Sequence, residues 1–211
     1  MRVGGTTRIK ICGITRPEDG AEAARLGADA IGLVFYAKSP RHVGIEQARA
    51  VIAALPPFVS VVALFVNPEP DYVRAVLAEC AIDMLQFHGE EDAVFCRSFQ
   101  RPYLKAVRVK PGMDLAEIAA QYPDARAVLT DSFVEGAHGG TGATFDWSLL
   151  PEALPLPLIL SGGLDEHNVA AAVAQVRPAA VDVSSGVEAS KGIKDAARMA
   201  AFISGVRHGS L

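Results

Sequence analysis

The chain alternates between short, continuous apolar runs and longer segments whose apolar residues recur with helical spacing. Proline suits the first turn of a helix and glycine its end, so Pro17 and Gly27 bracket the first periodic segment. The apolar runs predict strands at residues 8–11, 30–35, 59–65, 84–87, 104–109, 127–130, 158–160 and 181–183. The periodic segments predict helices at residues 17–26, 45–55, 70–80, 91–99, 115–122, 147–150, 166–176 and 194–206.

Strand and helix alternate through the whole chain, which is typical of βαβ units with a parallel sheet. Strands that are apolar throughout are expected in a sheet covered on both faces. An open doubly wound sheet usually carries a G-x-G-x-x-G fingerprint after its first strand, whereas this chain has Ile11-Cys12-Gly13-Ile14-Thr15 there. We therefore expect an α/β fold in which residues 1–211 form one (β/α)8 TIM-barrel domain, with residues 1–7 as a loose N-terminal extension.

Composition and charge narrow the class of protein. Half of the 211 residues are hydrophobic, 21% are charged and the formal net charge is −4, which indicates a globular protein and argues against general nucleic-acid binding. No apolar run reaches the roughly 18 residues that span a bilayer, so we expect no membrane interaction. The first residues lack the apolar segment of a signal peptide, and we expect a cytoplasmic protein.

Three widely spaced cysteines and no CxxC pair predict neither a zinc site nor a dithiol centre. Cys80 and Cys96 fall in predicted helices, where a small buried side chain is the simplest interpretation. Cys12 ends the first predicted strand, and in a barrel the carboxyl ends of the strands form the mouth where active sites lie. The other polar residues at or after such ends are Lys38, Arg41, Asn67, Gln86, His88, Arg108, Asp131 and Asp182.

The last two predicted strands run into Ser161-Gly162-Gly163 and Ser184-Ser185-Gly186. Glycine lets the backbone approach a ligand closely, and bare N–H groups near a helix start favour an anion. The loops after the last two strands of such barrels frequently hold phosphate. These glycines therefore predict a phosphate cradle, with tight turns alone as the alternative. Asp182 is equally consistent with a buried structural acid and with a substrate contact.

Several segments taken together resemble the phosphoribosylanthranilate isomerase family of tryptophan biosynthesis. They are the segment from Lys10 to Thr15, Asp131, the loop at residues 139–142 that leads to Phe145-Asp146-Trp147, and the runs at residues 161–164 and 181–188. The similarity runs in register from about Arg8 to Phe202. One departure is Thr130, where the family more often has leucine.

The resemblance implies a cofactor-free, metal-free Amadori rearrangement of N-(5-phosphoribosyl)anthranilate to 1-(2-carboxyphenylamino)-1-deoxyribulose 5-phosphate. It implies that Asp131 is the general acid on the ring oxygen and that Cys12, as thiolate, is the general base at C2. Lys10, two positions earlier on the same side of the strand, is a candidate for lowering the thiol pKa.

The resemblance also assigns substrate binding. Arg41 is expected to fork onto the anthranilate carboxylate. The phosphate is expected at backbone N–H groups near Gly162, Gly163, Ser185 and Gly186, with Gly142 as a cap. The expected partner is this phosphosugar alone, in a monomer or homodimer.

Two other interpretations remain open from the sequence. Another enzyme on a phosphate-binding barrel is one: a ribulose-phosphate epimerase needs metal ligands at several strand ends, and the histidine-pathway isomerase uses an aspartate where Cys12 stands. A non-catalytic phosphosugar-binding barrel is the other. Gln86 and His88 are interpreted as a polar layer in the mouth outside the catalytic set, and Lys38 and Glu188 as structural residues.

Overall fold

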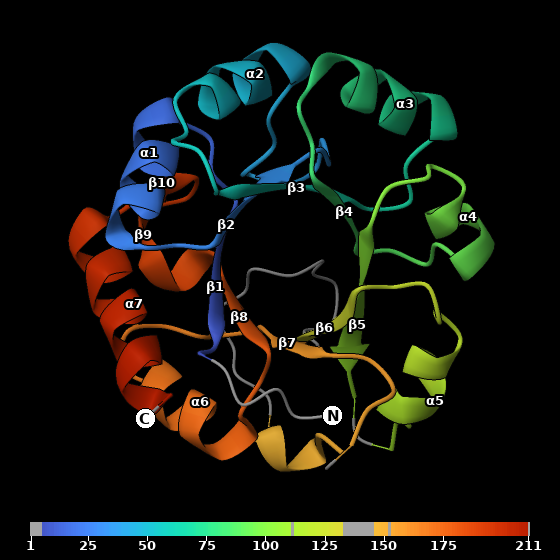
Figure 1. Ribbon diagram of the computed structural model, residues 1–211, viewed down its shortest axis with the longest axis vertical. Coiled ribbons are helices and arrows are strands. Elements are labelled where there is room, and N and C mark those ends of the chain that lie inside the picture. The colour runs from blue at the N-terminus through green and yellow to red at the C-terminus, as the bar shows by residue number, and fades with distance from the viewer. Residues whose placement is uncertain (1–5, 111, 133–145, 152, 211) are drawn as a thin grey trace.

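The computed structural model describes residues 6–110, 112–132, 146–151 and 153–210. Eight parallel strands pair in sequence order into a closed barrel, and β8 pairs back onto β1 with Ile9 opposite Val181. The strands are β1 (Arg8–Cys12), β2 (Ala30–Val34), β3 (Ser60–Phe65), β4 (Met84–Phe87), β5 (Tyr103–Val109), β6 (Ala127–Ser132), β7 (Leu158–Leu160) and β8 (Ala180–Val183). The predicted (β/α)8 architecture is confirmed, and Figure 1 shows the ring of strands enclosed by helices.

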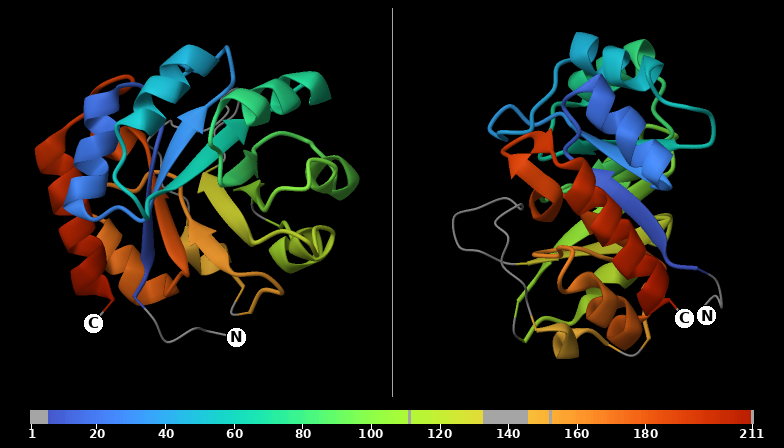
Figure 2. Two further views of the ribbon diagram at one scale, coloured as in Figure 1. Left: turned by 45° about the horizontal axis from the view of Figure 1, so that its top comes forward. Right: turned by 90° about the vertical axis from the view of Figure 1, so that its left-hand side faces the viewer.

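The helices cover the outside of the barrel in both further views (Figure 2). Pro17 lies in the first turn of the first helix, and Gly27 ends it with φ 104°. The helices are α1 (Pro17–Leu26), α2 (Ile45–Ala53), α3 (Pro70–Glu79), α4 (Ala93–Arg97), α5 (Leu115–Ala120), α6 (Val169–Val176) and α7 (Ala196–Gly209). A 3-10 helix, η1 (Trp147–Leu149), precedes β7.

Side chains on each strand alternate between the helix layer and the barrel interior. Ile9 and Ile11 of β1 belong to the cluster that also contains helix residues such as Val173 and Val206. A separate cluster gathers residues from β3, β5, β6 and β7 inside the barrel: Val62, Leu104, Ala106, Ala127, Leu129 and Ile159. This alternation turns Lys10 and Cys12 inward, and by the same count Asp131, two residues after Leu129, also points inward.

The helix predicted at residues 194–206 is wrong at its start. Lys194 lies instead in β10 (Ile193–Lys194), which pairs antiparallel with β9 (Glu188–Ser190). The following helix begins only after Asp195, whose side chain accepts a hydrogen bond from the backbone N–H of Arg198. The backbone N–H of Lys194 is taken by Asp19 Oδ2 at 3.0 Å, so it is held in the hairpin.

Several other boundaries also differ from the prediction: the helix predicted at residues 91–99 is shorter, at Ala93–Arg97, and the one predicted at residues 147–150 is the 3-10 helix η1. The sixth α-helix begins at Val169 rather than at residue 166, because Asp165 Oδ1 accepts the N–H groups of His167 and Asn168 and forms a turn before the helix. Thr7, assigned to a loose extension, is 5% exposed and donates a hydrogen bond to the carbonyl of Pro178 at 3.2 Å. Residues 1–5 lie outside the described residues.

The three cysteines are unpaired thiols, and all are buried. Cys96 sits in α4 and Cys80 follows the end of α3, which confirms their interpretation as small buried side chains. Among the helices in the described part of the chain, none has the length and apolarity to span a membrane.

Candidate active site

A cavity of about 370 Å³ opens at the carboxyl ends of the strands. Its lining brings together most of the predicted site residues: Cys12, Arg41, Asp131, Gly162, Gly163, Asp182 and Ser185. Gly186 lies beside the cavity without being among its lining residues, and Gly142 lies outside the described residues. Gln86 and His88 also line it, as a polar layer in the mouth should.

Cys12 is the last residue of β1, and its side chain turns into the barrel opposite Gly32 of β2. A Cβ atom on Gly32 would lie only 2.7 Å from the sulfur of Cys12, so the absent side chain there gives the thiol its space. The thiol packs against Val34 and Leu64 and is 5% exposed. It therefore lies on the apolar floor of the cavity.

Burial raises the pKa of the Cys12 thiol, and the positive charge of Lys10 opposes that rise without cancelling it. Lys10 is itself paired: its Nζ lies 2.8 Å from Asp182 Oδ1, and the Asp182 charge raises the thiol pKa further. As predicted, the charge of Lys10 acts to lower the pKa of the Cys12 thiol, but the predicted net lowering is wrong. Burial raises this pKa more than a lysine already paired with Asp182 can lower it.

Asp131 of β6 is in contact with His88, whose Nε2 lies 3.2 Å from Asp131 Oδ2. The other ring nitrogen of His88 lies 3.2 Å from Gln86 Nε2. Gln86 is fully buried in β4, and His88 directly follows the end of that strand. Their alternation with Leu85 and Phe87 was the signal in the sequence that both face inward.

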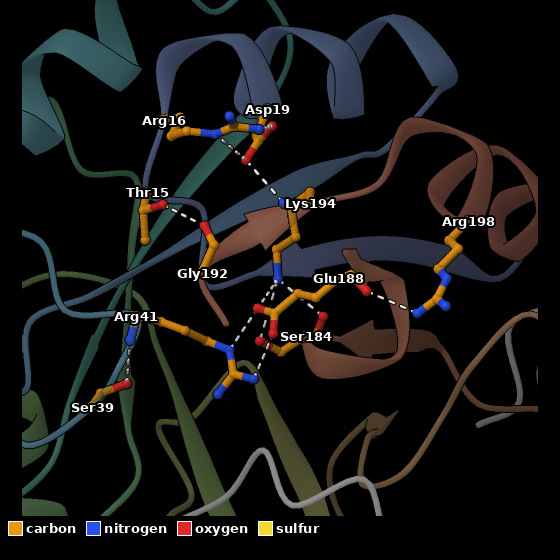
Figure 3. Close-up of polar contacts among 10 residues, drawn as sticks. All are labelled: Thr15, Arg16, Asp19, Ser39, Arg41, Ser184, Glu188, Gly192, Lys194 and Arg198. Atoms are coloured by element: carbon orange, nitrogen blue, oxygen red, sulfur yellow. Dashed lines mark hydrogen bonds and ion pairs between the residues drawn. The ribbon is translucent and has the colours of Figure 1, made fainter. Parts of the chain in front are cut away.

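Arg41 contacts a carboxylate of the protein itself. Its Nε and Nη2 lie 2.7 and 2.8 Å from the two carboxyl oxygens of Glu188, which confirms a structural contact for Glu188 (Figure 3). The aliphatic stem of Arg41 passes over Gly13, where a Cβ atom would meet Arg41 Cδ at 2.5 Å. This pair is not visible in the sequence, because 147 residues separate the two side chains.

The loops after β7 and β8 pack against each other at the rim of the cavity. Gly162 and Gly163 have φ values of 89° and 65°, which glycine adopts without strain, and Asn168 Nδ2 holds the Gly163 carbonyl at 2.8 Å. A side chain on Gly186 would collide with the carbonyl oxygen of Leu164. Among the described residues, no hydrogen bond is formed by the N–H groups of Gly163, Ser185 or Gly186, the last two lying in the 3-10 helix η2 (Ser185–Val187).

Asp182 bridges neighbouring strands: it pairs with Lys10, and its Oδ2 lies 3.4 Å from Ser161 Oγ. These contacts favour a scaffold role for Asp182, which also lines the cavity. No group of three or more His, Cys, Asp or Glu side chains that would hold a metal ion occurs within the described ranges.

Comparison with known proteins agrees with this geometry. Residues 9–205 match the family model described as N-(5'-phosphoribosyl)anthranilate (PRA) isomerase. The N-(5'-phosphoribosyl)anthranilate isomerase of Pseudomonas aeruginosa (strain LESB58) is 61% identical over 200 residues, which cover 95% of each chain.

Solved structures give the same result. The phosphoribosylanthranilate isomerase of Thermotoga maritima is 42% identical with a TM-score of 0.87, covering 95% of this chain and 98% of that one. A second isomerase structure, in complex with reduced 1-(o-carboxyphenylamino)-1-deoxyribulose 5-phosphate, is 41% identical with a TM-score of 0.84 and covers 97% of this chain and 100% of that one. The chain therefore belongs to the N-(5'-phosphoribosyl)anthranilate isomerase family.

Proposed function

We propose that the protein isomerises N-(5-phosphoribosyl)anthranilate to 1-(2-carboxyphenylamino)-1-deoxyribulose 5-phosphate in tryptophan biosynthesis. Family membership supports the reaction, and the observation that carries the residue assignment is the shared cavity of Cys12 and Asp131. The two residues come from β1 and β6, which are not neighbours in the sheet, so they face the cavity from different sides. A substrate between them would meet a thiol and a carboxyl group at once.

Asp131 is the general acid of the first step. Its proton goes to the furanose ring oxygen, the bond between that oxygen and C1 breaks, and the nitrogen lone pair forms a protonated imine. The contact with His88 supports this role, because it holds the carboxyl group of Asp131 in the lining of the cavity. Positioned acids of this kind contribute about 10²- to 10⁴-fold to a rate.

Cys12 is the general base of the second step. Its thiolate takes the proton from C2 of the ribose, the electron pair moves into the imine, and the resulting enolamine tautomerises to the ketone. The raised pKa of the thiol has two consequences: fewer molecules carry the thiolate at neutral pH, and each thiolate is a stronger base toward a C–H bond.

Arg41 binds the anthranilate carboxylate, and the loops after β7 and β8 bind the phosphate. Glu188 uses Nε and Nη2 of the Arg41 guanidinium, so the carboxylate binds at the Nη1 edge. The bare N–H groups of Gly163, Ser185 and Gly186 support the phosphate assignment. A related structure that holds a reduced product analogue supports a ligand of this size and charge in this fold.

The test follows the loss of anthranilate-type fluorescence when the protein is added to freshly made substrate. Wild-type protein should turn the substrate over, and Cys12→Ala and Asp131→Asn should each lose about 10²-fold or more. Cys80→Ala, which removes a buried thiol outside the cavity lining, is the matched control and should retain activity. Tight ligand binding by a wild-type protein that turns nothing over would contradict the proposal and indicate a phosphosugar-binding barrel.

A further inference from the structure

Glu188 lies between two buried cations. Its carboxylate accepts both Nε and Nη2 of Arg41, and its Oε1 also lies 2.9 Å from Lys194 Nζ. None of the three side chains is more than 10% exposed, and that of Lys194 is fully buried. Figure 3 shows the two cations reaching this carboxylate from different elements, Arg41 from the loop after β2 and Lys194 from β10.

The rest of the structure fixes this triad of Arg41, Glu188 and Lys194 in place. Arg198 of α7 donates to the backbone carbonyl of Glu188 at 2.8 Å, and Asp19 of α1 holds the backbone N–H of Lys194. The stem of Arg41 is confined by Gly13, the residue next to Cys12. The guanidinium therefore has one orientation, set by groups that lie outside the cavity.

The triad contains two cations and one anion. Three acceptors lie around Lys194 Nζ, at 2.9 Å (Glu188 Oε1), 3.0 Å (Ser184 O) and 3.5 Å (Ser184 Oγ), which matches the three donors of an ammonium group. Burial lowers the pKa of Lys194 below its usual value, and the charge of Glu188 opposes that effect without cancelling it. Burial acts to raise the pKa of Glu188, but its contacts with Arg41 and Lys194 outweigh it and the pKa lies below its usual value. The three acceptors around Nζ hold Lys194 as an ammonium group, so the triad sets the two cations Arg41 and Lys194 against the single carboxylate of Glu188.

Of the triad, Arg41 is the member whose charge reaches the cavity, which Lys38 also lines. Arg41 lines the cavity, whereas Glu188 and Lys194 are not among its lining residues. Of the five guanidinium donors, Glu188 takes two, and no acceptor for Nη1 is found among the described residues. A buried net charge is costly until an anion joins it, and the cavity is where that anion arrives.

We propose that Glu188 and Lys194 are positioning residues that make the site select a substrate ring bearing a carboxylate. Glu188 orients Arg41 so that its Nη1 edge faces the cavity. Lys194 offsets the charge of Glu188, so that Arg41 is oriented without being neutralised. The inference rests on the proposed function, in which Arg41 is the group that meets the carboxylate.

The test compares two ligands by isothermal titration calorimetry. One is reduced 1-(o-carboxyphenylamino)-1-deoxyribulose 5-phosphate, and the other is the same compound without the ring carboxylate. The ratio of their dissociation constants measures carboxylate selection, and a general loss of packing does not change it. Wild-type protein should prefer the carboxylate by about tenfold or more, the range expected of a charge-assisted contact.

Lys194→Met and Glu188→Gln should each reduce this ratio at least fivefold, while binding of the ligand without the carboxylate changes less than threefold. Glu188→Gln keeps the size of the side chain, so it remains informative if Lys194→Met does not fold. Lys105→Met is the matched control: Lys105 is another buried lysine, 2.9 Å from Glu91, outside the cavity lining. Its ratio should equal that of wild type.

Arg41→Met separates this inference from the proposed function. If Arg41→Met abolishes the preference but Glu188→Gln and Lys194→Met keep or increase it, the positioning role is wrong and the proposed carboxylate site stands. If Arg41→Met itself leaves the ratio unchanged, the proposed carboxylate site is wrong.

Discussion

At the scale of single residues, the absence of a side chain at position 32 determines where the Cys12 sulfur lies. The two residues face each other across β1 and β2, and the space that a Cβ atom would fill is occupied by the thiol. Gly32→Ala should displace the sulfur, cost about 1–3 kcal/mol of unfolding free energy and reduce kcat about tenfold or more. Gly44→Ala, at a site with φ −82° and no atom within 4 Å, is the control for both measurements. An unchanged kcat in Gly32→Ala would refute this prediction.

The pH dependence of activity also belongs to Cys12. Because burial raises the thiol pKa, the fraction of molecules that carry the Cys12 thiolate still increases with pH above neutrality, and kcat/KM should increase with it. Lys10→Met removes the charge that opposes the shift and leaves Asp182 uncompensated, so the pKa rises further and the profile should move to higher pH. A profile that moves to lower pH would exclude this role for Lys10.

What the sequence revealed at this scale depended on local pattern. Cys12, Asp131 and the inward alternation of Gln86 and His88 are visible because strand ends and period-two spacing mark them. The ion pairs of Arg41 and Lys10 are not visible in the sequence, because their partners, Glu188 and Asp182, come from the other end of the chain. Whether desolvation or an ion pair controls a pKa is decided only by the three-dimensional surroundings.

At the scale of elements, the loops after β7 and β8 act as one unit. The carbonyl of Leu164 fills the space that a side chain at position 186 would need, so the two loops pack this closely only with glycine there. Gly186→Ala should force them apart and raise KM about tenfold, with a smaller effect on kcat, because it disturbs phosphate binding more than chemistry. Steady-state kinetics with a parallel melting curve check this. A variant that lowers kcat alone would contradict the phosphate assignment.

The β9–β10 hairpin shows why some elements were mispredicted. The spacing of apolar residues after residue 194 is helical, so it predicts a helix that starts at Lys194. Lys194 lies in β10 instead, where Asp19, 175 residues away in the chain, accepts its backbone N–H. Ser184 and Glu188 accept hydrogen bonds from its side chain. Strands buried on both faces need no such distant partner to be recognised, and their predicted positions were confirmed.

At the scale of the whole molecule, stability and chemistry rest on different buried charges. Lys105 of β5 pairs with Glu91 at 2.9 Å and donates to the Gly89 carbonyl at 2.7 Å, away from the cavity lining. Lys105→Met leaves the buried Glu91 carboxylate without its cation and should cost about 3–5 kcal/mol of unfolding free energy. Urea unfolding measures this loss, and kcat of the folded variant should match wild type. Unchanged stability would show that the pair contributes nothing.

The barrel as a whole was predictable because its eight repeats all carry the same signal. Closure was not visible in any one segment. It follows from the pairing of β1 with β8, where Arg8 lies opposite Ala180 and Ile11 opposite Val183. The same closure brings Cys12 and Asp182 into one mouth, so a prediction of the closed barrel is also a prediction that these residues share a site.

The role of Cys12 as the base is tested most directly in a single turnover of substrate that carries deuterium at C2 of the ribose. We expect wild-type protein to release this deuterium to solvent as product forms, more slowly than it releases hydrogen. Cys12→Ala at equal concentration should form almost no product and retain the label. A Cys12→Ala protein that forms product and loses deuterium as fast as wild type would contradict the assignment of the thiol as the base.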